Sequence, residues 1–313
     1  MALALFIDVG RSLDEAVKRV QLAEKLGYDE VWQSQLPYTR DTTVVMSAYA
    51  VATTRVGLGT GVLPIYTRHP TAMAQMAATL DELSGGRFRL GIGVSHRATV
   101  EGMWGLKLER PVEAMAEYLE IVTSLIRSGS ASVEGKFFTA RANYTTPRRE
   151  DMPIMISALN PRMLELAGEK ADGVVLWMCS PAYVEKEVVP RVKAGREKAG
   201  KSLEGFAIVA SVPASLTSNP AGGRDVFRRS VQMYASLPFY RKMMDASGFA
   251  AELERGEISD AMVDELAGIG DANAIREAVR RYRDAGATVV GPGPFSGHEG
   301  AAGFEATLEA ARG

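Results

Sequence analysis

Tyr66, Arg68 and His69 lie together in the stretch GTGVLPIYTRHP (59–70), directly after an apolar run that is typical of a strand. A phenol and an imidazole can give or take a proton, and a guanidinium can hold an anion. His96 comes shortly after a second such run, FRLGIG (88–93). Tyr66, His69 and His96 are therefore the candidates for proton transfer.

These residues also have structural interpretations. His69 precedes Pro70 and could cap a helix that starts near Thr71, which we favour over direct chemistry. Arg68 is expected to form an ion pair at the same corner. The position of His96 just after a strand favours contact with a ligand.

Other catalytic patterns are missing from the chain. It contains no GxSxG, HExxH or GxxxxGK[ST] motif. Its three histidines, His69, His96 and His298, are far apart in sequence, and Cys179 is its only cysteine. We expect no metal site and no disulfide, and we expect Cys179 to pack rather than to react.

The elements that must position these residues alternate along the chain. Short apolar runs predict strands at 3–8, 30–33, 56–63, 88–93, 154–157, 173–176, 206–213 and 288–291. Amphipathic patterns predict helices at 13–26, 41–53, 71–83, 111–127, 161–171, 181–199, 224–245 and 273–285, with 303–312 closing the chain. This alternation predicts an α/β fold, a (β/α)8 TIM barrel forming a single domain over 1–313.

Local signals mark several helix boundaries. Asn160 followed by Pro161 is typical of a helix start. Gly27, Gly173 and Gly286 stand where helices hand over to strands, and we expect them to end helices with positive φ.

Two connections are long enough to be insertions in the βα loops. Residues 128–153 alternate polar and apolar residues, which predicts a small hairpin. Residues 234–272 contain Pro238 with methionines and aromatic residues, which we expect to build helix core first and a substrate wall second. In a barrel such loops cover the mouth, the end where the carboxyl termini of the strands meet. Both are thus expected as lids or substrate walls, or else as surface insertions or a dimer contact.

Small residues dominate the expected mouth. They are Gly59, Gly61, Gly91, Gly93, Ser95, Ser157, Ala158, Gly291 and Gly293. Glycine lets a flat ligand approach the backbone closely, so a planar cofactor is expected here. The helix that starts at Asn160 directs free N–H groups to the same place, where a phosphate could bind.

Composition excludes several classes of partner. The 36 basic and 38 acidic residues give a formal net charge of −2, which offers no electrostatic footprint for nucleic acid or an anionic membrane. The apolar run in the stretch MALALFIDVGRS at the start is too short for a signal peptide or a membrane span. We expect a folded, cytoplasmic protein.

Several segments resemble one known family. TGVLPIYTRHPTAMAQMAATLDELSGGRFRLGIGVSH (60–96) and ISALNPRMLELAGEKADG (156–173) are similar to the bacterial luciferase-like monooxygenases and reductases. That superfamily binds FMN or the deazaflavin coenzyme F420 in a (β/α)8 barrel. The TRHP and SGGRF elements look most like its F420-dependent branch, which implies coenzyme F420 as cofactor, a small-molecule substrate and a homodimer.

The resemblance also implies roles for individual residues. Gly61 and Val62 would form a bulge, often a cis peptide in this family, behind the deazaflavin ring. The other cofactor-binding residues it implies are Gln35, Gly93, Val94, Ser95, His96, Ser157, Ala158, Asn160 and Pro161. The family's sugar-phosphate dehydrogenases have Asp followed by His at Gln35 and Leu36, and the missing histidine argues against that activity.

The preferred hypothesis is a coenzyme F420-dependent oxidoreductase that moves a hydride between the deazaflavin and a small organic substrate. An FMN-dependent monooxygenase that uses dioxygen is the first alternative. A barrel that binds a ligand without catalysis is the second. A nicotinamide enzyme is the third, and GLGTG (57–61) lacks the spacing of a dinucleotide fingerprint.

Overall fold

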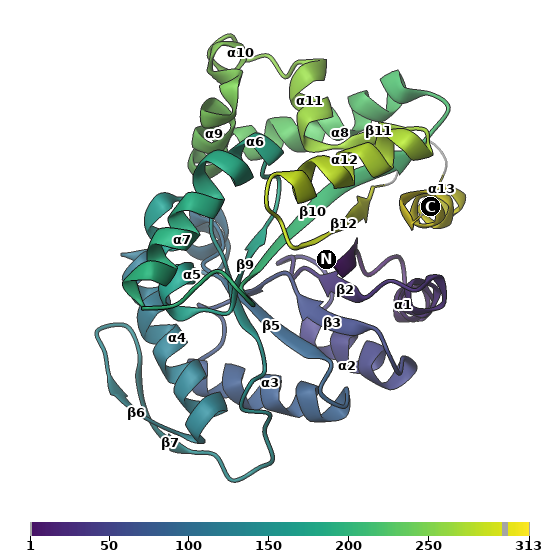
Figure 1. The fold of residues 1–313 in the computed structure, drawn as a ribbon. Coiled ribbons are helices and arrows are strands. Elements are labelled where there is room, and N and C mark those ends of the chain that lie inside the picture. The colour runs from purple at the N-terminus through teal and green to yellow at the C-terminus, as the bar shows by residue number, and fades with distance from the viewer. Residues whose placement is uncertain (1, 296–299, 313) are drawn as a thin grey trace.

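The computed structural model describes residues 2–295 and 300–312, and an eight-stranded parallel barrel forms its centre (Figure 1). Each strand pairs in parallel with the next, and the last pairing, between β9 and β10, closes the ring. In order around the ring the strands are β10 (Ala207–Leu216), β12 (Val289–Pro294), β1 (Ala2–Ile7), β2 (Glu30–Gln33), β3 (Gly57–Thr60), β5 (Phe88–Gly93), β8 (Ile154–Ser157) and β9 (Gly173–Leu176). The predicted (β/α)8 barrel is confirmed.

Helices surround the barrel and connect its strands (Figure 1). They are α1 (Leu13–Leu26), α2 (Thr42–Ala52), α3 (Pro70–Leu83), α4 (Pro111–Ser128), α5 (Pro161–Lys170), α6 (Pro181–Tyr183), α7 (Val189–Lys198), α12 (Ala272–Asp284) and α13 (Gly300–Arg312), with one-turn π-helical segments η1 (Ala98–Met103) and η2 (Val184–Val188). Asn160 caps α5 and Pro161 is its first residue, as predicted. No helix in the described ranges is long and apolar enough to cross a membrane.

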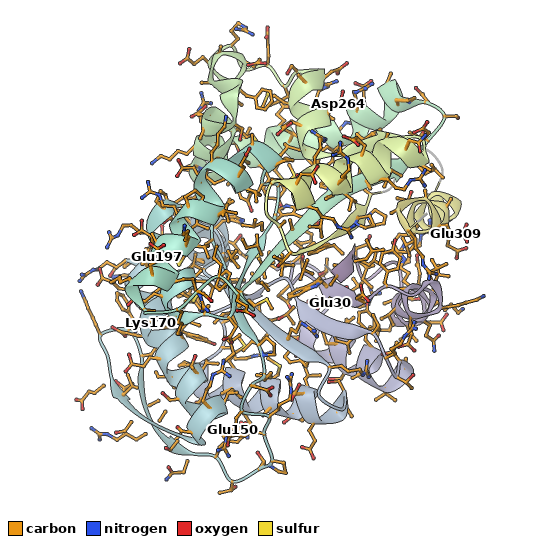
Figure 2. All side chains as sticks on the ribbon, in the orientation of Figure 1. Glu30, Glu150, Lys170, Glu197, Asp264 and Glu309 are labelled. Carbon is orange, nitrogen blue, oxygen red and sulfur yellow. The ribbon has the colours of Figure 1, made fainter. Side chains whose placement is uncertain are left out.

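The barrel has two apolar layers. A large cluster lies between the outer faces of the strands and the helices and includes Leu5, Leu90 and Ile156. A smaller cluster fills the interior with alternate strand residues, among them Ala4, Trp32 and Val209. Glu30 lies among the strands, whereas the other labelled side chains lie at the periphery (Figure 2).

Several predicted boundaries were wrong for identifiable reasons. The strand expected at 56–63 is split into β3 and a short β4 (Leu63–Pro64), which pairs with β5. The helix expected at 224–245 is two helices, α8 (Pro220–Ala235) and α9 (Pro238–Met244), because Pro238 has no N–H to continue α8. Strand β11 (Gly268–Gly270), which extends the sheet beside β10, was not predicted.

The two insertions differ in position. Residues 234–272 follow β10 and form α9, η3 (Asp245–Phe249), α10 (Ala250–Glu254) and α11 (Asp260–Leu266), so they belong to the mouth. Residues 128–153 contain the predicted hairpin, β6 (Ser130–Glu134) with β7 (Thr139–Asn143). The hairpin follows a helix and precedes a strand, so it is an αβ insertion, and the expectation that it lies in a βα loop was wrong.

The predicted roles of several glycines were wrong. Gly173 begins β9 instead of ending a helix, and a Cβ there would lie 2.6 Å from the carbonyl oxygen of Ala207. A Cβ would lie 2.5 Å from the Trp32 ring at Gly59, 1.9 Å from the Thr60 oxygen at Gly91, and 1.6 Å from the Ala4 oxygen at Gly291. These glycines therefore let the barrel pack against itself and leave no floor for a ligand.

Candidate active site at the barrel mouth

Three residues predicted to bind a cofactor meet at the mouth. A Cβ on Gly93 would lie 2.4 Å from Ser157 Oγ and 2.6 Å from Val62 Cγ2. The three residues come from the ends of β5 and β8 and from the turn between β3 and β4. Only glycine allows this approach, so the close packing of Val62 and Ser157 explains why β5 ends in glycine.

Gly61 is held by the end of β2. Its N–H donates to the Gln33 carbonyl oxygen at 2.9 Å, and its own carbonyl oxygen accepts from Ser34 Oγ at 2.7 Å. The Gly61–Val62 peptide is cis, as the family resemblance implied. Gly61 is half-buried, and a Cβ there would make ordinary van der Waals contact with Trp32 and Val175 at 3.7 to 3.8 Å.

Val94, Ser95 and His96 continue from β5 and are half-buried. Ser95 has a φ of 60°, a left-handed conformation that non-glycine residues rarely adopt. The His96 ring lies 5.8 Å from the Tyr240 ring, centroid to centroid. Burial lowers the pKa of His96, which favours a neutral imidazole.

The loop between β8 and α5 is fixed from two sides. Asn160 Oδ1 accepts from the Met163 N–H at 3.0 Å, and Tyr183 Oη donates to the Leu159 carbonyl oxygen at 2.6 Å. Ala158 is buried between these anchors, and Pro161 is exposed. The loop therefore presents Ser157 in one orientation at the mouth.

Gln35 is engaged within its own loop. Its Oε1 accepts from the Thr42 N–H at 2.7 Å, and its Nε2 donates to the Leu36 carbonyl oxygen at 3.2 Å. The side chain thus ties the end of β2 to the start of α2. Its contact with a cofactor stays a prediction.

The candidates for proton transfer divide into two kinds. His69 caps α3, with Nδ1 2.8 Å from Thr71 Oγ1, and its ring contacts Phe138 of the hairpin edge-on. The Tyr66 hydroxyl is buried without a hydrogen-bond partner, and burial raises its pKa. His69 therefore has a structural role at this corner, whereas Tyr66 and His96 remain candidates for proton transfer.

Arg68 forms the expected ion pair only in part. Its Nη2 lies 3.5 Å from Asp41 Oδ2, and its backbone carbonyl oxygen accepts from Tyr118 Oη at 2.8 Å. Its Nη1 is buried and has no partner. One N–H group of this guanidinium thus remains available.

Sequence reasoning placed Ser211 at a strand end of the mouth but gave it no role. It is 2% exposed, and its Oγ has no hydrogen-bond partner. A Cβ on Gly293 would lie 2.8 Å from this oxygen, which places Ser211 in the barrel interior beside β12. A serine within the apolar run AIVASVPASL was the available signal.

Unpaired buried polar atoms are rare in folded proteins, and those at a mouth point to a ligand. Tyr66 Oη, Arg68 Nη1 and Ser211 Oγ all follow or lie near the ends of barrel strands. They fit a ligand that carries hydrogen-bonding groups. Within the described ranges no group of three or more His, Cys, Asp or Glu residues could hold a metal ion, and His298 lies outside those ranges.

Cys179 is buried, and burial raises the pKa of its thiol. A protonated, inaccessible thiol is a poor nucleophile. It therefore packs, as predicted.

The fold defines a (β/α)8-barrel protein with unpaired polar atoms near the carboxyl ends of its strands. Residues 3–289 match the family model described as luciferase-like monooxygenase. The chain belongs to this family.

Relatives and solved structures refine the comparison. The chain is 31% identical over 262 residues to the 5,10-methylenetetrahydromethanopterin reductase of Archaeoglobus fulgidus, covering 83% of this chain and 72% of the relative. The coenzyme F420-dependent tetrahydromethanopterin reductase of Methanopyrus kandleri has the same fold, with a TM-score of 0.81, 23% identity and coverage of 99% and 97%. The oxygenating constituent of 3,6-diketocamphane monooxygenase from Pseudomonas putida, in complex with FMN, also has it, with a TM-score of 0.75, 16% identity and coverage of 99% and 97%.

Proposed function

We propose that this chain is a coenzyme F420-dependent oxidoreductase that transfers a hydride between the deazaflavin and a small organic substrate. The observation that supports it most is the meeting of Val62, Gly93 and Ser157 next to Gly61 at the mouth. The relatives named as reductases, and the F420-dependent enzyme of the same fold, support the choice of cofactor.

Different residues around this meeting point would contact different parts of the cofactor. Gly61, Val62, Gly93, Val94 and Ser95 would face the ring. The loop formed by Ser157, Ala158, Asn160 and Pro161 would hold the phosphate-bearing tail, with the N-terminus of α5 favouring negative charge. Gln35 would contribute through the backbone, because its amide is already bonded in its loop.

When bound, the deazaflavin supplies a two-electron hydride couple. The chain must then hold the substrate against the ring and give or take one proton. His96 is the group proposed for this proton, because its imidazole is neutral and half-buried beside the predicted ring position. Tyr66, whose buried hydroxyl has no partner, is the second candidate.

Titration of the apoprotein with coenzyme F420 and with FMN tests the proposal. We expect saturable binding of F420, and Ser157→Leu should weaken it by roughly tenfold because the larger side chain crowds Gly93 and Val62, where the ring is proposed. Ser130→Leu, at an exposed position of the hairpin, is the matched control and should leave the dissociation constant unchanged. Tight binding of FMN without binding of F420 would replace the proposal with the monooxygenase alternative.

We further propose a homodimer formed through α2. Val44 and Val51 lie seven residues apart on this helix and are 60% and 74% exposed. They share one face, and large exposed apolar residues on one helix face are typical of an interface. Light scattering should show a dimer that Val51→Asp dissociates. The lone reduced cysteine supports a cytoplasmic location, which cell fractionation tests.

A further inference from the structure

Four aromatic side chains form a continuous row at the mouth. Successive ring centroids are 5.8 Å apart for His96 and Tyr240, 4.7 Å for Tyr240 and Tyr234, and 6.1 Å for Tyr234 and Trp177. We call these four residues the aromatic row. His96 and Trp177 follow the ends of β5 and β9, and the two tyrosines come from α8 and α9 of the insertion after β10.

The aromatic row reaches across the mouth. At one end His96 adjoins Gly93 to Ser95, where the cofactor ring is proposed. At the other end the position of a Cβ on Gly293 lies 3.9 Å from Trp177 Cζ3, so the indole approaches β12. His96 and Trp177, the two ends of the row, therefore lie at the mouth, while Tyr240 between them also packs in the large apolar cluster.

The backbone next to both ends of the row is unusual. Ser95, which precedes His96, has a φ of 60°, and Met178, which follows Trp177, has a φ of 49°. Residues with a side chain rarely adopt this left-handed conformation, and such positions cluster at functional sites. The turn at Ser95 sets the direction in which the chain reaches His96, and the turn at Met178 sets the direction in which it continues after Trp177.

The row is uncharged at neutral pH. Burial lowers the pKa of His96 and raises the pKa of Tyr234 and of Tyr240. A negatively charged group placed against these rings would lose its hydration without gaining a counter-charge from the row. Flat conjugated rings, in contrast, gain from offset or edge-to-face contact with aromatic side chains.

We propose that the aromatic row is the wall that faces the substrate, and that the substrate presents a flat, uncharged, conjugated ring to it. The proposal rests on the function proposed above, because the row faces a substrate only if the ring of the cofactor lies beside Gly61. It names the chemical class that the site selects.

Ligand-observed NMR titration of the F420-saturated protein tests the class with three probes. Acetophenone carries the flat uncharged ring, cyclohexyl methyl ketone replaces it with a puckered saturated ring, and benzoate adds a negative charge. Acetophenone should bind roughly threefold to tenfold more tightly than either. Equal or tighter binding of the saturated ketone or of benzoate overturns the proposal.

Variants locate the effect. Tyr234→Leu should weaken acetophenone by roughly threefold to tenfold, remove its advantage over the saturated ketone, and leave the affinity for F420 unchanged. Met233→Leu, on the same helix and 57% exposed, should change neither. An acetophenone preference that survives Tyr234→Leu intact contradicts the assignment to the row.

Failure of the two proposals can be told apart. Binding of F420 without preference for the flat ring overturns only the substrate class. If F420 does not bind, the proposed function fails, and the same three probes are titrated into the apoprotein. A preference for acetophenone that Tyr234→Leu abolishes still supports the row as a ring-binding wall, and its absence overturns it.

Discussion

The buried polar groups compared at the two ends of the barrel differ in whether they have hydrogen-bond or ion-pair partners. At the closed end, where the strands begin, the Glu30 carboxylate accepts from Trp32 Nε1 at 3.0 Å and pairs with Arg89 Nε at 2.9 Å. At the mouth, Tyr66 Oη and Ser211 Oγ have no partner. A folded chain can satisfy its own buried polar groups, as this one does for Glu30, although Tyr144 Oη and Arg283 Nε, away from the mouth, also lack a partner. The unsatisfied groups at the ends of the strands are those that a ligand at the mouth could reach.

Arg87 strengthens the contrast at the closed end. Its guanidinium donates to the carbonyl oxygens of Ser84, Val56, Ala50 and Thr53 and to the Thr53 hydroxyl. It thus joins the C-terminal ends of α2 and α3 to the start of β5. The SGGRF element of the sequence has a structural role, away from the chemistry.

The largest expected effect comes from removing the cation of the closed end. Arg89→Met leaves the Glu30 carboxylate, 7% exposed, without its ion pair and should lower the free energy of unfolding by about 2 to 4 kcal/mol. The expected loss is smaller than for a fully buried pair because Arg89 is 30% exposed. Chemical denaturation measures the change.

The double variant Glu30→Gln, Arg89→Met is the control for that experiment. It also removes the Glu30 charge, which Arg89→Met leaves without a partner, so most of the lost stability should return. The affinity for F420 should be the same in all three proteins. A weaker affinity in Arg89→Met would break the distinction between the ends.

A smaller loss is expected from Arg87→Lys. Lysine keeps the charge but lacks the planar fork, so several of the carbonyl groups lose their donor. The free energy of unfolding should fall by about 1 to 2 kcal/mol in a denaturant titration. The same change at the exposed Arg229 is the matched control and should have no measurable effect.

The fold followed from local patterns, because short apolar runs and helix caps are properties of neighbouring residues. β2, β5, β8 and β9 have the predicted bounds. The aromatic row and the Ser211 environment could not be predicted in this way, since they join residues from β5, β9, α8, α9 and β10. The role of Gly59 and Gly91 could not be predicted for the same reason, because Trp32 and Thr60, which they contact, lie on neighbouring strands of the sheet.

Removing a side-chain hydroxyl at the mouth should raise the free energy of unfolding instead of lowering it. Ser211→Ala removes a buried hydroxyl that has no partner, so the apoprotein should gain about 1 kcal/mol in its free energy of unfolding. Ser84→Ala is the matched control at the closed end, where Oγ donates to the Asp81 carbonyl oxygen at 3.1 Å, and it should lose about 1 kcal/mol. Thermal and denaturant unfolding of the apoproteins measure both. A loss of stability in Ser211→Ala would show that its hydroxyl serves the fold.

The smallest effect concerns the pH dependence of stability at the mouth. Burial lowers the pKa of His96 in the folded state, so below the ordinary histidine pKa of about 6.5 the unfolded chain takes up a proton that the folded chain does not. The contribution of His96 therefore favours folding less as the pH falls through this window, and His96→Asn should flatten the slope of stability against pH there. Because His96 is only half-buried, we expect a difference below about 1 kcal/mol between pH 7 and the acid side of the window. Denaturant titrations of the apoproteins across this range measure it. An unchanged slope in His96→Asn would mean that His96 has the same pKa in the folded and unfolded chain, so that its imidazole is hydrated at the mouth and not packed in the aromatic row.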